Sequence, residues 1–201
     1  MRKLFLLLAL LLPLPAGAVT VERIAAVIDG QVVTVSEVSQ LVEIRFFARK
    51  GDSEDEHRRN VLDVLIAQVL RLRDVERFGA QEIPTESIEA RFAEIRGRFA
   101  SPSEFEAAVA RAELTLDEVR ALIKRQLQVD AYIQERFLPA VFIGNEEIDE
   151  YYRTRGSSGT LSPAAREELR TALRSTRLAE EIDKWTARLR LRANVDVFAW
   201  R

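Results

Sequence analysis

The segment Arg23–Val38, RIAAVIDGQVVTVSEV, constrains the fold most, because it combines two apolar runs, a turn and a helix start. The runs Ile24–Ile28 and Val32–Val33 flank Asp29-Gly30, a pair that favours a tight hairpin turn because glycine tolerates positive φ. An isolated hairpin is only marginally stable in water, and both runs are too apolar to face solvent. A distant part of the chain must therefore cover or extend this hairpin.

Apolar residues spaced three and four apart, together with capping residues and breakers, predict helices along the rest of the chain. Thr34 and Glu37 have the spacing of a capping box, so the first helix should begin directly after the hairpin. The predicted helices cover residues 34–50, 52–78, 85–99, a short stretch from 101, and then 115–138, 145–152 and 162–194. Residues 195–199 alternate in hydrophobicity, which predicts a terminal strand that could extend the hairpin. The fold class is therefore mainly α, with a small sheet formed by an N-terminal hairpin and the C-terminal strand.

Residues 1–18 have the three parts of a secretory signal peptide: the basic pair Arg2 and Lys3, an apolar run, and the small residues that end at Ala18. We expect cleavage after Ala18 and export of the mature chain. The alternative is an uncleaved membrane anchor, against which the shortness of the run argues. The mature chain, 19–201, is expected to form one domain. It would consist of a helical part at 19–152, a Gly/Ser-rich linker at 153–162, and a C-terminal helix and strand at 163–201.

Composition excludes several classes of function. Removal of the signal peptide takes away two of the 30 basic residues and leaves 28 against 32 acidic ones, a net charge of −4 that gives no reason to expect nucleic-acid binding. Cysteine is absent, so the chain has no disulfides and no thiol nucleophile. The single histidine, His57, excludes multi-histidine metal sites, and its place in a charged run predicts a solvated surface residue.

No catalytic, metal or cofactor motif is found in the sequence. The adjacent carboxylates, such as Glu146-Glu147 and Glu180-Glu181, point about 100° apart on a helix and do not form a converging acid/base pair. An enzyme is therefore the weakest of the functional hypotheses. Prolyl isomerisation above background would revive it.

A stripe of large apolar residues is the candidate binding feature. Phe92, Ile95 and Phe99 share one helix face, and Phe105 continues the stripe on the next helix. Every helix must bury one face, so the stripe is better explained as core than as a groove. If it lines a groove instead, it would accept apolar segments of another protein, and these four residues are the candidate client-binding site.

Three segments together resemble the SurA-type periplasmic chaperones. The opening RIAAVIDGQVVTVSEV is similar to the apolar hairpin that precedes the family's first helix, with Ile24, Ala26, Val27, Ile28, Asp29, Gly30, Val33, Thr34, Ser36, Glu37 and Val38 in the matching places. Residues 143–152, IGNEEIDEYY, resemble the segment that closes the family's N-terminal helical region. Residues 180–197, EEIDKWTARLRLRANVDV, resemble its last helix and terminal strand.

The resemblance implies a chaperone module that holds unfolded outer-membrane proteins in the periplasm without ATP, with its terminal strand joined to the hairpin. In the full-length relatives, parvulin prolyl-isomerase domains lie between the second and third of these segments. Here only residues 153–162 occupy that gap, which is far shorter than an independent domain, so prolyl-isomerase activity should be absent. The alternative is a structural or adaptor subunit of an envelope assembly, or a self-associating dimer whose groove is already occupied.

Overall fold

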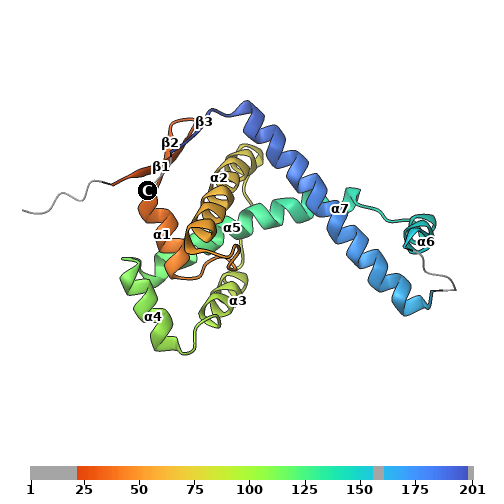
Figure 1. Ribbon diagram of the computed structural model, residues 1–201, viewed down its shortest axis with the longest axis horizontal. Helices are drawn as coiled ribbons and strands as arrows, with labels where there is room; N and C mark the ends of the chain where they lie inside the picture. Colours follow the sequence, from red (N-terminus) through yellow and green to blue (C-terminus); the bar gives the residue numbers. More distant parts are fainter. Residues whose placement is uncertain (1–21, 156–160, 199–201) are drawn as a thin grey trace, which may run out of the picture.

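The computed structural model describes residues 22–155 and 161–198, and within them it contains seven α-helices and one three-stranded sheet (Figure 1). The predicted signal peptide, the middle of the predicted linker and Ala199 lie outside the described residues. In chain order the elements are β1 (Ile24–Ile28), β2 (Gln31–Thr34), α1 (Val35–Glu43), α2 (Glu54–Phe78), α3 (Thr85–Arg96), α4 (Pro102–Arg111), α5 (Leu116–Arg136), the 3-10 turn η1 (Leu138–Ala140), α6 (Asn145–Thr154), α7 (Pro163–Arg192) and β3 (Val195–Val197).

The hairpin and its third strand are confirmed. β1 and β2 pair antiparallel across the Asp29-Gly30 turn, where both residues have positive φ, 47° and 85°. β3 pairs antiparallel with the other edge of β1, with Ala26 opposite Val197, so the strand order is β2-β1-β3. The sheet therefore joins two segments from opposite ends of the described chain, and β2 and β3 are its edge strands.

Most of the predicted helix starts are also confirmed. Capping boxes close at Thr34 and Thr115, while Ser101 and Ser162 accept hydrogen bonds from the first turns of α4 and α7. The predicted N-cap of α6, Asn145, was wrong, because Gly144 occupies the N-cap position and Asn145 is already helical. The Asn145 side chain instead accepts a hydrogen bond from Arg170 on α7, at 2.7 Å.

The first helix is shorter than predicted and ends at Glu43 rather than near residue 50. Arg45 adopts positive φ, 49°, and the two hydrogen bonds of a Schellman motif form, from Arg45 N–H to Val42 O and from Phe46 N–H to Leu41 O. The turn carries Phe46 into the core, where it is almost fully buried. Burial of this ring outweighs the strain of a non-glycine residue at positive φ, so no glycine marks the helix end.

Two apolar clusters form the interior. The larger lies among the sheet, α1, α3, α4 and the facing sides of α2 and α5, which contact each other near the middle of the molecule (Figure 1). The smaller lies where α7 crosses α2 and α5, and Trp185 packs there against Val75, Val129 and Ile133. Leu189 of α7 adjoins both clusters and so links them.

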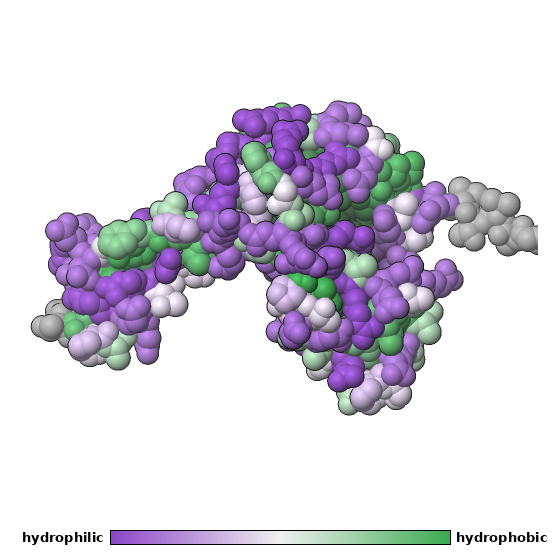
Figure 2. Space-filling model, turned by 180° about the vertical axis from the view of Figure 1, so that it is seen from behind, coloured by the Kyte–Doolittle hydropathy of each residue, from purple (hydrophilic) through white to green (hydrophobic). Residues whose placement is uncertain are grey.

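An arm made of α6 and the first half of α7 extends from this body (Figures 1 and 2). Arginines of α7 hold α6, with Arg166 paired to Asp149 at 2.7 Å and Arg177 paired to Glu147 at 2.5 Å. Phe142, before α6, is 80% exposed on this arm. Among the described residues, no helix combines the length and the apolar character needed to span a bilayer.

Candidate binding cleft

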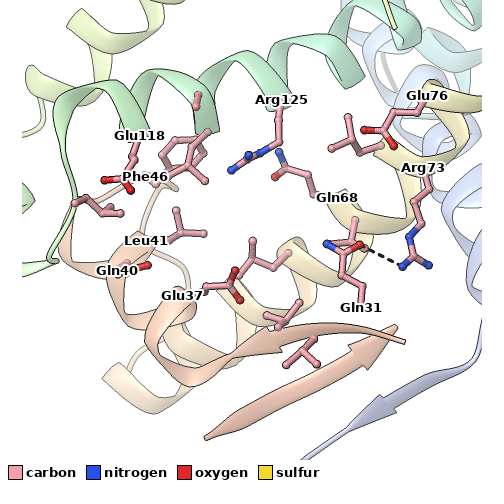
Figure 3. Close-up of a pocket in the computed structure, with 18 residues that line it drawn as sticks. Gln31, Glu37, Gln40, Leu41, Phe46, Gln68, Arg73, Glu76, Glu118 and Arg125 are labelled. Carbon is pink, nitrogen blue, oxygen red and sulfur yellow. Dashed lines mark hydrogen bonds between the residues drawn. The ribbon is translucent and has the colours of Figure 1, made fainter. Parts of the chain in front are cut away.

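An open cleft with a volume of about 590 Å³ lies between the hairpin and α1 on one side and α2 and α5 on the other (Figure 3). The hairpin and α1 are distant in sequence from α5, and tertiary packing brings them to the same cleft. Its lining residues are Gln31, Val32, Val33, Glu37, Gln40, Leu41, Phe46, Leu65, Gln68, Val69, Leu72, Arg73, Glu76, Leu114, Glu118, Ala121, Leu122 and Arg125.

The floor of the cleft is aliphatic and only half covered. Val33, Leu41 and Phe46 are buried at its base as part of the larger core cluster. Above them, five aliphatic side chains are partly exposed because none of the described helices and strands lies over them: Leu65, Val69, Leu72, Leu114 and Leu122. A ligand with apolar side chains would remove this surface from water, at about 25 cal/mol per Å² of apolar area.

The rim is polar, and much of it already has a structural role. Arg73 donates to the carboxylate of Asp29 at 3.0 Å, to Ile28 O at 2.9 Å and to Gln31 Oε1 at 3.2 Å, which ties α2 to the hairpin turn. Glu37 and Glu118 accept hydrogen bonds from the N-cap backbones of α1 and α5. Hydrogen bonds from Thr115, mainly from its backbone N–H and also from its hydroxyl, lower the pKa of Glu118. This rim carboxylate is therefore charged at neutral pH.

The four residues predicted to bind a client lie elsewhere. The structure brings Phe92, Ile95, Phe99 and Phe105 together, but it buries all four in the larger core cluster. The predicted helix over 85–99 was too long, because α3 ends at Arg96 and Phe99 follows it rather than sharing its face. The Phe105 ring stands edge-on to Phe92 and Phe99, with ring centroids 5.4 and 5.5 Å apart. Burial agrees with the core interpretation of the stripe. Client contact through these residues stays a prediction.

The cleft itself was not predicted from the sequence. The signal that could have found it is the width of the apolar stripe on α2, where Leu65, Val69 and Leu72 run beside the buried row of Leu62 and Ile66. A single packing partner covers one row of a helix, so a second row indicates either another partner or an open surface. Whether this second row is covered or open depends on where α5 packs, which the sequence of α2 does not show.

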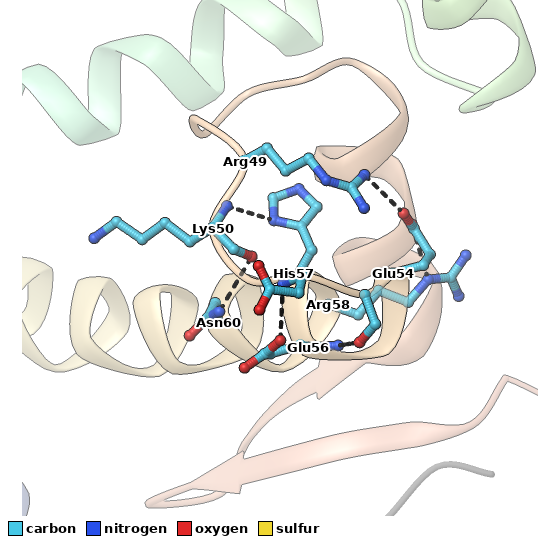
Figure 4. A network of polar contacts seen from close by, with 9 residues as sticks. Arg49, Lys50, Glu54, Glu56, His57, Arg58 and Asn60 are labelled. Carbon is cyan, nitrogen blue, oxygen red and sulfur yellow. Dashed lines mark hydrogen bonds and ion pairs between the residues drawn. The ribbon is translucent and has the colours of Figure 1, made fainter.

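The prediction of a solvated surface His57 was wrong, since the side chain is only 5% exposed. The irregular segment between α1 and α2 folds over the first turn of α2, and Lys50 N–H donates to His57 Nδ1 at 3.4 Å (Figure 4). Asn60 fixes the same segment by donating to Lys50 O at 3.3 Å. The imidazole thus helps to hold a loop. It also lines a second pocket, of about 560 Å³, beside Phe99 and Arg98.

The described residues contain no cluster of histidine and carboxylate side chains that could hold a metal ion. The cleft instead combines an aliphatic floor with a polar rim, an arrangement that suits the binding of a segment with apolar side chains.

Comparison with known proteins gives one informative match. Over 154 residues, 74% of this chain, the sequence is 24% identical to Chaperone SurA of Saccharophagus degradans. The match covers 36% of that protein, so the chain spans about a third of the length of the relative. No protein-family model matches the chain. The similarity supports a SurA-like family.

Proposed function

We propose that this protein is an ATP-independent periplasmic chaperone that holds unfolded exported polypeptides, outer-membrane proteins among them, in the open cleft. The observation that carries the proposal is the row of half-buried aliphatic residues between the hairpin, α2 and α5. The similarity to Chaperone SurA supports the same class of function. Contacts of this kind are numerous and individually weak, which suits the retention and later release of many different clients.

The proposal includes the absence of prolyl-isomerase activity. The helical part and the C-terminal helix are joined by the short connection between α6 and α7, where the full-length chaperones of this type carry parvulin domains. The match to only part of a longer relative is consistent with this interpretation.

The test is suppression of aggregation of an unfolded β-barrel protein by the purified mature chain at near-equal molar ratio. Val69→Gln and Leu122→Gln place polar groups on the cleft floor and should weaken suppression severalfold. Leu191→Gln changes an aliphatic side chain that is 87% exposed in the last turn of α7 and does not line the cleft. It is the matched control that should keep full activity. Melting temperatures of all variants establish that each is folded.

Failure of the unchanged protein to suppress aggregation over a wide range of concentrations would contradict the chaperone proposal. A photo-crosslinking residue at position 69 or at position 99 separates the cleft from the predicted aromatic stripe. Labelling of an unfolded client from position 69 supports the cleft. Labelling from position 99 alone would instead support the stripe that includes Phe92, Ile95 and Phe105.

The adaptor alternative predicts a different result in solution. The exposed Phe142 on the arm is the observation that favours it, because aromatic side chains are enriched where proteins contact each other. A stable dimer that binds no added peptide would support this second function. A monomer that binds peptide would exclude it.

A further inference from the structure

The free edge of β2 borders the cleft, and this juxtaposition indicates how a client would be held. Gln31, Val32 and Val33 of β2 all line the cleft, and β2 is an outer strand of the sheet (Figure 3). An edge strand presents backbone groups that can pair with another extended chain. We infer that an unfolded client binds by adding an antiparallel strand to β2, a mode of binding that rests on the chaperone function proposed above.

The register of the hairpin identifies the backbone groups that are available. Ile28 and Gln31 close the two-residue turn as a hydrogen-bonded pair, so the next pair, Val27 and Val32, is a non-hydrogen-bonded one. The N–H and C=O of Val32 therefore point away from β1, toward the free edge. Thr34 shares this orientation, but its N–H donates to Glu37 Oε2 at 2.8 Å. Val32 is thus the residue of β2 that offers both backbone groups to a partner.

The side chains of the added strand follow from the same register. Side chains opposite each other in neighbouring strands lie on the same face of a sheet. Val33 is buried on the face that continues into the cleft floor, whereas Val32 is 44% exposed on the outer face. Client residues opposite Gln31 and Val33 would therefore lie over Leu65 and Val69, and the residue opposite Val32 would face outward. The preferred segment has apolar residues at alternate positions, as strands of β-barrels do.

Charge selects among such segments. The rim carries the carboxylates of Glu37, Glu76 and Glu118 and the guanidinium groups of Arg73 and Arg125. Arg73 is neutralised by its ion pair with Asp29, at 3.0 Å. Carboxylates therefore outnumber the remaining positive charge around the cleft. An extended segment with basic residues between its apolar ones should bind more tightly than one with acidic residues there.

The test uses a short fluorescent peptide with leucine at alternate positions and threonine or lysine between them. N-methylation removes one amide donor at a time. Methylation of the central non-leucine residue should weaken binding at least tenfold, because that residue exchanges hydrogen bonds with Val32. Methylation of the neighbouring leucines should change affinity less than twofold, because their amides face away from β2. Replacing the lysines by glutamate should also lower affinity, by an amount that shrinks as salt is added.

Two substitutions test the protein side. Val32→Pro removes the outward N–H at an edge position that tolerates proline, and it should reproduce the loss seen with the methylated peptide. Val32→Thr keeps both the N–H and a β-branched side chain, and it should bind normally. Circular dichroism and melting temperatures establish whether Val32→Pro is folded, while the peptide series gives an answer with the unchanged protein.

The outcomes separate the binding mode from the function. Equal affinity across the methylated peptides, with tight binding of the parent peptide, would overturn strand addition and leave the chaperone proposal standing. Loss of affinity at the leucines instead would overturn the proposed register. Absence of binding by the parent peptide would overturn both proposals. A dimer that Val32→Pro dissociates would show that a second copy of this chain, rather than a client, occupies the edge.

Discussion

At the scale of single residues, positive φ of a non-glycine residue at two helix ends marks where tertiary packing overrides local preference. Arg45 and Glu113 both occupy the left-handed position that ends a helix, with φ of 49° and 54°. Glycine normally fills this position because it carries no Cβ. Glu113 makes the turn that lets Leu114 reach the cleft floor, since Leu114 N–H donates to Val109 O at 3.1 Å. The strain is thus associated with the shape of the cleft floor.

Glu113→Gly should therefore stabilise the protein by about 0.5 kcal/mol, because glycine relieves the strained φ but also gains freedom in the unfolded chain. Glu106→Gly is the matched control. It lies on the exposed side of α4, within the helix, and should destabilise by about 1 kcal/mol. Urea unfolding of both variants measures the difference. Destabilisation by both to the same extent would contradict the role assigned to Glu113.

His57 and Arg45 both differ from what their local sequence predicts, because residues distant in the chain decide their surroundings. The charged neighbours of His57 are consistent with a surface position. The local sequence does not indicate that residues 44–53 fold over the imidazole. Likewise, Arg45 gives no local sign of a helix end. The helix end depends on the burial of Phe46, and the burial of His57 depends on the loop that Lys50 and Asn60 hold over it. A local pattern contains neither set of contacts.

At the scale of elements, helix caps are the most reliably predicted features because their hydrogen bonds lie within four residues of one another. In α5, Thr115 Oγ1 accepts from Glu118 N–H at 3.2 Å, and Glu118 Oε2 accepts from Thr115 N–H at 2.7 Å. Thr115→Ala removes the first of these bonds. It should lower the free energy of unfolding by about 1 kcal/mol, measured by urea unfolding at neutral pH. Ser87→Ala, at an exposed site in the first turn of α3, is a control that should change stability little.

The same cap makes stability depend on pH. Hydrogen bonds from Thr115 lower the pKa of Glu118 from its usual value near 4.5. A lowered pKa in the folded state means that the stabilising contribution is complete above about pH 4.5 and is lost as pH falls through the lowered value. Thermal unfolding between pH 6 and pH 3 should show this loss, and Glu118→Gln should reduce the dependence on pH. An unchanged slope in the variant would show that Glu118 does not contribute.

The elements themselves were largely predictable, whereas the candidate site was not. Periodicity and caps located the seven helices because each depends on a contiguous window of sequence. The cleft depends on the separation of α1 from α5, and the stripe that the sequence favoured on α3 and α4 is covered by the contacts of these helices with α1 and α5. Periodicity shows that a face is apolar, but it does not show which face is left without a partner.

At the scale of the whole molecule, the sheet makes the two ends of the described chain one structural unit. Asn194 N–H donates to Asp29 Oδ1 at 2.7 Å, Asp29 N–H donates to Asn194 O at 2.8 Å, and Phe198 N–H donates to Ala25 O at 2.9 Å. With the pairing of β3 to β1, these bonds cover the edge of β1 that β2 leaves open. The prediction of one domain over 19–201 depends on this junction and on α7, which adjoins both apolar clusters.

Deletion of residues 194–201 should therefore lower the free energy of unfolding by about 3 kcal/mol, because it removes several backbone hydrogen bonds worth about 1 kcal/mol each. The melting temperature should fall by about 10 °C. Deletion of residues 199–201 alone keeps β3 and is the matched control. An unchanged transition after the longer deletion would show that the third strand does not support the domain.

The hydrogen bonds between Asp29 and Asn194 close a loop of 165 residues, which also fixes an order of events in time. Synthesis proceeds from the N-terminus, so β1 and β2 are complete long before β3 exists. Contacts between such distant residues form slowly, because the entropy cost of closing the loop comes before the stabilisation by the hydrogen bonds. Until residue 197 has been made, both edges of the hairpin are open. The growing chain therefore presents an unpaired strand of the same kind as the client segments that the mature protein is proposed to bind.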